Sequence, residues 1–390
     1  MYLSCWDPEI ILLSSLLVPA SELRASGAIT LWSMKRFEQA GNEVSFPHIH
    51  PEIAKFLCPI IYSAGECRRP KITVDWDTRT LLADDDAAHD FGLNDLCLLA
   101  RECELHLRDP TNVKGVLLRS EQSNLWSLIV RNRSDPSIIS FSTLMALNQL
   151  ESSIRIHVDN QSQAGKAPLL KNMISGISFA PLRTVLRVLL LPNNGKGLNL
   201  RNLWWHGFVG STPDPSWLAL VLVLSTFLTD DVVSEKISAE ASQAAFTDFR
   251  GSADTERSIK MGKALLSDDL SLSEIERWLP ASHRGLWVLS LGWCRARIAP
   301  TCVCAVWTML LEHGLRLEWC QANGRPEDRA ARSDAYYVTL DGHGQRKQHN
   351  LMLHPYLQED GSPNKLADRI GGDCVAMLTD LYTSSCGGPN

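Results

Sequence analysis

Residues 141–158 read FSTLMALNQLESSIRIHV and decide the kind of fold to expect. Apolar side chains recur in this stretch at spacings of three and four residues: Phe141, Leu144, Leu147, Leu150, Ile154 and Val158. This spacing is typical of an amphipathic helix with one buried face. The stretch 178–191, SFAPLRTVLRVLLL, repeats the pattern and ends at the turn cluster PNNGKG. We therefore predict an all-α protein built around a helical bundle.

A third helix is predicted farther along the chain. The segment DPSWLALVLVLSTFL begins with Asp214 as a candidate N-cap and Pro215 at the first helical position. Its residues are apolar on every side, so the helix belongs in the middle of the bundle. The apolar stretch 217–228 is shorter than the roughly 20 residues that a membrane helix needs. The sequence therefore predicts no membrane-spanning segment.

Composition places the chain among globular proteins. It has 390 residues, 45% hydrophobic and 21% charged, with a formal net charge of -6. The net charge gives no basic excess, so any nucleic-acid binding must come from a local patch. The eleven cysteines are an odd number without a CxxC pair, which favours reduced, buried thiols over a disulfide framework. The first basic residue is Arg24, which argues against a signal peptide.

A short internal similarity links two apolar segments. LNQLESSIRI at 147–156 and TMLLEHGLRL at 308–317 share a glutamate four residues before an arginine. One reading is two surface ion pairs, each worth tenths of a kcal/mol. The other is that the two segments belong to related units. The residues concerned are Glu151, Arg155, Glu312 and Arg316.

The segment LNLRNLWWHGF, residues 198–208, carries the candidate functional residues. The Arg201 guanidinium matches phosphate oxygens, and His206 can move protons near neutral pH. Asn202 has both donors and an acceptor and can orient either partner. Arg201 and His206 would be about 140° apart on a regular helix, so the three side chains could converge only at a helix start.

The charge around this segment is locally basic. Between residues 160 and 213 there is no aspartate or glutamate, whereas six basic residues occur: Lys166, Lys171, Arg183, Arg187, Lys196 and Arg201. A basic island of this kind suits an anionic ligand such as an RNA backbone. We therefore name Arg183, Arg187 and Lys196 as candidate phosphate-binding residues. The alternative is a buried tryptophan pair with a structural histidine.

The RNLWWHG motif, at 201–207, matches the RNxxxHG signature of a domain family, and it resembles the RNxxxH motif of the HEPN superfamily of helical bundles. Together with the upstream LESSIRI, the segment is similar to an animal family of endoplasmic reticulum membrane-associated RNA degradation proteins. The resemblance covers about 141–230, extends less clearly to about 322, and is weak at the N-terminus.

The resemblance implies a metal-independent endoribonuclease that needs no cofactor. Arg201 would hold the scissile phosphate, His206 would act as general acid or base, and Asn202 would orient both. Glu151, with Arg155 beside it, would support the site. The product would carry a 2′,3′-cyclic phosphate. Association with the endoplasmic reticulum membrane is implied as well, although we expect this chain alone to be soluble on the cytosolic side.

The chain also departs from the family pattern. HEPN catalysis usually needs two facing motifs, and after the Glu312–Arg316 segment no second RN-type motif follows. We therefore expect a shortened form that is either inactive alone or active as a homodimer. A non-catalytic helical scaffold that binds a partner is the alternative. The expected divisions are an N-terminal helical region at 1–140, a HEPN-like domain at 141–230, a linker or surface helices at 231–284, and an incomplete second HEPN-like unit with an exposed tail at 285–390.

Other motifs are weaker. His48 and His50 could bind a metal, but no second ligand cluster at suitable spacing supports such a site. Cys302 and Cys304 lie in an apolar stretch and are expected in the core. The sequence lacks GxSxG, GxxxxGK[ST] and HExxH, which excludes the commonest hydrolase and nucleotide-binding motifs.

Overall fold

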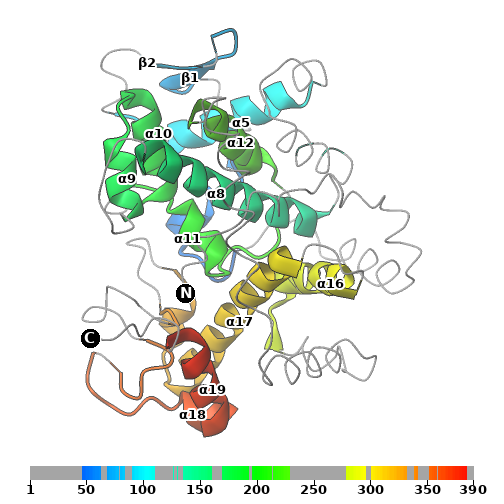
Figure 1. The fold of residues 1–390 in the computed structure, drawn as a ribbon, viewed down its shortest axis with the longest axis vertical. Helices are drawn as coiled ribbons and strands as arrows, with labels where there is room; N and C mark the ends of the chain where they lie inside the picture. Colours follow the sequence, from blue (N-terminus) through cyan, green and yellow to red (C-terminus); the bar gives the residue numbers. More distant parts are fainter. Residues whose placement is uncertain are drawn as a thin grey trace.

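Helices make up most of the structure, a computed structural model (Figure 1). It describes residues 46–62, 68–78, 80–83, 90–109, 126, 130, 135–159, 169–192, 196–212, 214–228, 278–295, 300–331, 338–340, 351–357 and 359–383. The prediction of a mainly helical protein is therefore confirmed, with one two-stranded sheet as the exception among these residues. Residues 1–45 and most of the predicted linker lie outside the described residues.

Helix α12, Ser216–Leu228, forms the centre of the bundle, as its uniformly apolar sequence predicts. It packs between α8, Pro136–Asp159, and α5, Leu93–Leu107. The helix begins at Ser216, so Pro215 precedes it instead of opening it. Asp214 still serves the helix start, because its Oδ1 accepts from the Ser216 N–H at 2.9 Å. Its Oδ2 accepts from the Ile60 N–H at 2.8 Å and thereby ties on a second segment.

The long helix α8 carries the apolar stripe on which the fold prediction rests. Its stripe residues from Phe141 to Val158 are buried in the main hydrophobic cluster. The helix begins at Pro136, ahead of the expected boundary at residue 141. Two further helices, α9 at Leu170–Gly176 and α10 at Ala180–Leu190, pack beside it and against each other. Helix α10 buries one face and exposes Arg187 on the other, as its period predicts.

The N-terminal region is not wholly helical, which corrects that part of the prediction for residues 1–140. Strands β1, Ile72–Asp75, and β2, Thr80–Ala83, pair antiparallel with Ile72 opposite Ala83. Alternating burial of Ile72 and Val74 explains the strand, because a period of two places both on the face that packs against α5.

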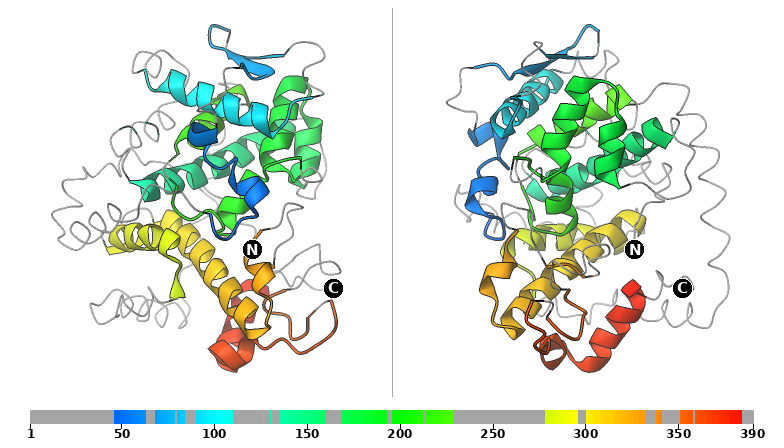
Figure 2. Two further views of the ribbon diagram at one scale, coloured as in Figure 1. Left: turned by 180° about the vertical axis from the view of Figure 1, so that it is seen from behind. Right: turned by 90° about the vertical axis from the view of Figure 1, so that its left-hand side faces the viewer.

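The segment 46–62 connects distant parts of the molecule along one side (Figure 2). It contains the short helices α3, Pro51–Ala54, and α4, Pro59–Tyr62, and α4 packs against α5 and α12. At its other end the His50 N–H donates to the Ala331 carbonyl at 3.0 Å, and the Ala331 N–H donates to the His48 carbonyl at 3.0 Å. This segment therefore joins the bundle to the C-terminal part.

The C-terminal part is built on a helical pair, α16 at Ala281–Arg295 and α17 at Pro300–Ala322. Helix α17 belongs to two hydrophobic clusters. Its first half, with Val306 and Met309, lies in the main cluster, and its second half, with Leu315 and Trp319, lies in a smaller one. The smaller cluster also includes residues of α18, Leu366–Ile370, and α19, Gly372–Thr383. The short helix η5, Pro326–Arg329, packs on α17.

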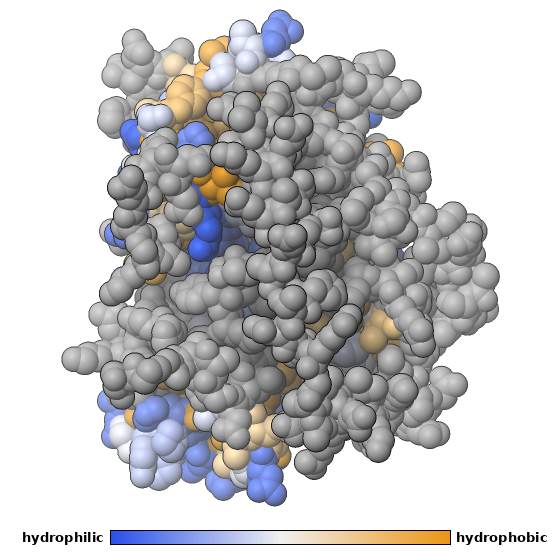
Figure 3. Space-filling model, viewed as in Figure 1, coloured by the Kyte–Doolittle hydropathy of each residue, from blue (hydrophilic) through white to orange (hydrophobic). Residues whose placement is uncertain are grey.

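The surface of the described residues is mixed in character. On the face drawn in Figure 3, the lower end, where α18 and α19 lie, combines hydrophilic residues with apolar ones. Met377 of α19 is 56% exposed. No helix in the described part of the chain is long and apolar enough to cross a membrane. Free thiols in this part of the chain include Cys58, Cys97, Cys103 and Cys320, which are buried, and Cys304, which is exposed, contrary to its predicted place in the core.

Candidate functional site

The RNxxxHG motif lies on α11, Leu200–Trp205, and on the turn that follows it. Leu200, Leu203 and Trp204 are buried and attach this short helix to the bundle, where it contacts α8 and α10. Asn199, just before the helix, adopts a left-handed conformation with φ of 54°. The helix therefore keeps Arg201, Asn202, Trp205 and His206 half-buried on its other side.

Arg201 is held by two oxygen acceptors. Its Nε donates to Glu151 Oε2 of α8 at 3.0 Å, and its Nη1 donates to Asn202 Oδ1 at 2.9 Å. The guanidinium carbon lies 5.9 Å from the centre of the Trp205 ring. Arg155 is also near Glu151, at 4.0 Å. The structure thus brings together the predicted group of Glu151, Arg155, Arg201 and Asn202.

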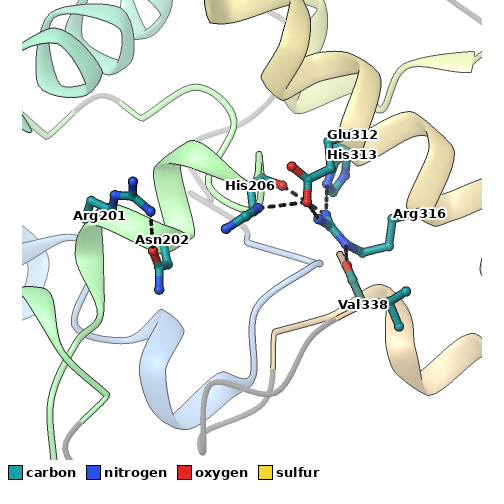
Figure 4. Close-up of polar contacts among 7 residues, drawn as sticks. All are labelled: Arg201, Asn202, His206, Glu312, His313, Arg316 and Val338. Atoms are coloured by element: carbon teal, nitrogen blue, oxygen red, sulfur yellow. Dashed lines mark hydrogen bonds and ion pairs between the residues drawn. The ribbon is translucent and has the colours of Figure 1, made fainter. Parts of the chain in front are cut away.

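His206 lies at the other end of α11 and contacts a different carboxylate (Figure 4). Its Nδ1 is 2.8 Å from Glu312 Oε1 of α17, a residue 106 positions away. An ionised carboxylate can only accept a hydrogen bond, so we infer that Nδ1 carries the proton. In the neutral ring, Nε2 is then the basic nitrogen. The carboxylate fixes both the tautomer and the orientation of His206.

The charge on Glu312 is stabilised despite its burial. Burial alone would raise the pKa of Glu312, but the neighbouring His206 and Arg316 outweigh it and hold the pKa below its usual range. Arg316 Nη2 donates to Glu312 Oε1 at 2.9 Å. Glu312 therefore stays ionised at neutral pH and can orient a histidine that gains and loses a proton.

Arg316 is fully buried and binds the motif segment to α17. Its Nη1 donates to the His206 carbonyl at 2.9 Å, and its Nε donates to the Val338 carbonyl at 2.8 Å. Its guanidinium carbon lies 4.2 Å from the centre of the Phe208 ring. A buried guanidinium needs such partners, since an unpaired charge in the interior is very costly. The predicted Glu312–Arg316 pair is therefore part of the tertiary structure and not an isolated surface pair.

The glycine of the motif allows the close approach of α11 and α17. Gly207 has φ of 71°, a left-handed conformation that favours glycine. A Cβ atom there would lie 2.9 Å from His313 Cβ and 3.0 Å from the Met309 carbonyl oxygen. The Gly207 carbonyl accepts a hydrogen bond from His283 Nε2 of α16. The HG dipeptide is thus the point at which the motif meets both α16 and α17.

The buried His283 and His313 and the half-buried His48 form a cluster beside the motif that the sequence did not predict. His283 and His313 stack with ring centres 4.3 Å apart, and His48 meets His313 edge-on at 4.7 Å. Burial, aided by the nearby positive charge of Arg316, lowers the pKa of His48 and His283 to about 4. The same causes, with His283 beside it, lower the pKa of His313 well below its ordinary value. All three are neutral near pH 7.

The structure separates the predicted phosphate-binding residues by role. Arg183 Nη1 donates to the Ile177 carbonyl at 2.5 Å and to the Ser178 carbonyl at 3.4 Å, so it braces the turn before α10. Arg187 and Lys196 are exposed. Lys171 is exposed as well, and Lys166 lies outside the described residues. The exposed members keep the freedom to contact an anionic ligand.

The other predicted ligands have structural roles. His50 caps α3, where its Nδ1 accepts from the Glu52 N–H at 3.3 Å, and His48 belongs to the histidine cluster. Across the described ranges, no group of three or more histidine, cysteine, aspartate or glutamate side chains is arranged to hold a metal ion. The site therefore consists of Arg201, Asn202 and His206 with the two glutamates that contact them.

Comparison with known proteins found no matching family model, no matching curated protein and no matching solved structure. The class of protein is therefore defined here by the geometry of the site. It is a helical protein in which two carboxylates, from α8 and α17, hold an arginine and a histidine of one short helix.

Proposed function

We propose that this protein cleaves RNA without a metal ion or cofactor, as a HEPN-type endoribonuclease. The observation that carries the proposal is the 2.8 Å contact between His206 Nδ1 and Glu312 Oε1. Arg201, five residues before His206, has a side chain that is 24% exposed. A carboxylate-oriented histidine can serve as general base and acid, and the Arg201 guanidinium at the other end of the same short helix can bind the charged phosphate backbone. Both side chains are partly accessible, which a reaction on a polymer requires.

The proposed reaction is an internal transesterification. His206 Nε2 takes the proton from a ribose 2′-OH, and the 2′ oxygen forms a bond to phosphorus. The bond from phosphorus to the 5′ oxygen breaks, and that oxygen receives a proton from the imidazolium. The products are a 2′,3′-cyclic phosphate and a 5′-OH end, so protons and atoms balance. Glu312 stabilises the imidazolium that forms between the two proton transfers.

Arg201 supplies charge to the phosphate in this scheme. Glu151 and Asn202 engage two of its N–H groups, and a guanidinium has five. The remaining N–H groups can bind phosphate oxygens, while Glu151 keeps the fork in place. Exposed Arg187 and Lys196 would extend contact along the RNA backbone.

The second carboxylate comes from α17 of the same chain, so we propose that one chain builds the arrangement around His206. The homodimer implied by the HEPN resemblance would place a second Arg201 and His206 opposite the first. Light scattering of the active fraction decides between these two assemblies. Membrane association at the endoplasmic reticulum belongs to the same resemblance and stays part of the proposal.

The direct test is cleavage of end-labelled single-stranded RNA in EDTA. We expect cyclic-phosphate ends from the natural chain, loss of cleavage in His206→Ala, and at least a tenfold slower rate in Glu312→Gln. His354→Ala, a half-buried histidine in the C-terminal part, is the matched control and should cleave normally. Circular dichroism must show that every variant is folded. Equal cleavage by His206→Ala and the natural chain would overturn the proposal.

A second candidate is a non-catalytic helical scaffold. It is favoured by the fact that both motif side chains already bind carboxylates, Arg201 to Glu151 and His206 to Glu312. On this reading, the motif joins α8, α11 and α17 and presents a surface to a partner. His206→Gln would then retain the fold and partner binding, and neither it nor the natural chain would cleave RNA.

A further inference from the structure

A cleft lies at the sheet end of the molecule, and the residues that line it are outside the RNxxxHG site. It has a volume of about 790 Å³, which is within the range of small-molecule sites. One wall is the segment 68–70 and strand β1, and the other is helix α5, with Ile60 of α4 at the end. Leu98, Arg101, Glu102 and Leu105 are spaced at three and four residues, so they share one face of α5.

Three arginines line this cleft: Arg68, Arg69 and Arg101. Arg69 is exposed, and the Arg68 side chain is 45% exposed, with its Nη2 3.6 Å from Asp95 Oδ1. Arg101 pairs with the buried carboxylate of Glu104. Arg108 shares that carboxylate, so one negative charge is divided between two guanidiniums. Each of the three arginines thus has a carboxylate nearby, Arg69 acting on Glu102, and the Glu104 charge is the one divided between two guanidiniums.

The rest of the lining is mainly apolar. Ile60, Val74, Leu98 and Leu105 contribute hydrocarbon surface, and Leu105 is 52% exposed although it is a large apolar residue. A single exposed leucine is ordinary on a protein surface, but this one borders the arginines of the cleft. A ligand with both an anionic group and an apolar part would match the two kinds of lining.

Glu102 is the one acid in the lining. Burial raises the pKa of Glu102, against the opposing effects of the Val74 backbone and of Arg69. The Arg69 guanidinium and the Glu102 carboxylate therefore act on each other within the cleft.

We propose that this cleft binds a small organic phosphate whose non-phosphate part is aromatic or apolar. The guanidiniums of Arg68, Arg69 and Arg101 hold the phosphate, since their planar forks match its oxygens. Leu105, Val74 and Ile60 cover the apolar part. This site is separate from the RNA-cleavage proposal and does not depend on it.

The test is isothermal titration of the full chain with phenyl phosphate and, separately, with inorganic phosphate. We expect phenyl phosphate to bind at least tenfold more tightly, because it alone fills the apolar part of the cleft. Arg69→Ala should weaken both ligands at least tenfold, and Leu105→Ser should weaken phenyl phosphate but not inorganic phosphate. Arg369→Ala, an arginine of α18 in the C-terminal part, is the charge-matched control and should bind as the natural chain does.

Either of two results would overturn the proposal. One is that the natural chain binds neither ligand; the other is that Arg69→Ala binds phenyl phosphate as tightly as the control. Arg69 and Leu105 are both exposed, so their substitution should leave the fold intact, and thermal unfolding checks this directly. RNA cleavage measured in the same variants should not change.

Discussion

Helices α8 and α17 carry the same Glu-x-x-x-Arg spacing but use it in opposite ways. On α8, Glu151 and Arg155 are 4.0 Å apart, and the arginine side chain is 24% exposed. On α17, Glu312 and Arg316 are 2.9 Å apart, and the arginine side chain is wholly buried. Each glutamate also contacts a motif residue, Arg201 in the first case and His206 in the second. One spacing thus produces a loose, half-buried pair on α8 and a close, buried pair on α17.

The difference comes from what covers each helix. Arg316 lies where α17 passes from the main hydrophobic cluster to the smaller one, and it bonds to carbonyls of His206 and Val338. Among the described residues Arg155 makes no comparable contacts with backbone carbonyls, and its side chain is 24% exposed. The lesson is that an ion pair's importance depends on its burial and on what else its members hold.

The largest expected effect is the loss of Arg316. Arg316→Ala leaves Glu312 as a buried charge with one partner fewer and frees two carbonyls, so we expect a loss of about 3–5 kcal/mol in unfolding free energy. Arg155→Ala should cost less than about 1 kcal/mol, because an exposed pair contributes little. Urea unfolding followed by circular dichroism measures both. Equal losses in the two variants would contradict the contrast drawn between α8 and α17.

Acid should lower the unfolding free energy by protonating the histidines that lie between α16 and α17. His283 has a pKa of about 4 when folded and 6.5 as its ordinary value, so the unfolded chain binds the proton more readily. Its contribution to stability is complete above pH 6.5 and falls as the pH drops toward 4. A difference of this size corresponds to a loss of about 3 kcal/mol at 1.36 kcal/mol per pKa unit.

The groups around His283 either lower or raise its pKa. His48 and Arg316 lower the pKa of His283, and the hydrogen bond to the Gly207 carbonyl opposes them. Arg316 is charged throughout this pH range, whereas His48 and His313 gain charge only in acid. We expect His283→Gln to show a flatter loss of stability between pH 6.5 and 4 than the natural chain. Parallel urea titrations at several pH values give the comparison, and identical slopes would exclude a role for His283.

The glycines on the two sides give the next contrast. Gly207→Ala puts a Cβ 2.9 Å from His313 Cβ at φ of 71°, so we expect a loss of about 1–3 kcal/mol. A Cβ added at Gly176 of α9 would make only ordinary contacts, the nearest with Val158 Cγ1 at 3.5 Å, and Gly176 has no positive φ. Gly176→Ala should therefore be neutral or stabilising by up to about 1 kcal/mol. Thermal unfolding of both variants tests this, and a stable Gly207→Ala would show that α11 and α17 can separate at little cost.

Periodicity predicted the bundle well, and local spacing predicted part of the site. The stripe of α8 and the uniform apolarity of α12 were enough to place both in the core. Glu151 was expected near Arg201 because the HEPN resemblance implies a supporting acidic residue on the preceding helix. The His206–Glu312 contact joins residues 106 positions apart, and nothing in a single sequence reports which distant helix covers a motif.

The histidine cluster was missed for the same reason. His48, His283 and His313 come from three separate segments, and their neutral state depends on burial that only the folded chain provides. The Glu312–Arg316 repeat was the one signal available, since it marked α17 as similar to α8. It could not indicate that Arg316 would be buried while Arg155 stayed exposed.

The smallest expected effect concerns two arginines of α10: Arg183 contacts backbone carbonyls, and Arg187 is exposed. Arg183 donates to the Ile177 carbonyl, so Arg183→Ala should lower the unfolding free energy by about 1 kcal/mol. Arg187 is exposed, so Arg187→Ala should leave stability unchanged.

If RNA lies along this helix, Arg187 is the arginine that affects binding. Its loss should then reduce the salt dependence of RNA binding by about one phosphate contact. Fluorescence anisotropy with labelled single-stranded RNA at several salt concentrations measures that slope. An unchanged slope in Arg187→Ala, beside a weakened fold in Arg183→Ala, would confine the basic residues of α10 to structural roles and favour the scaffold over the ribonuclease.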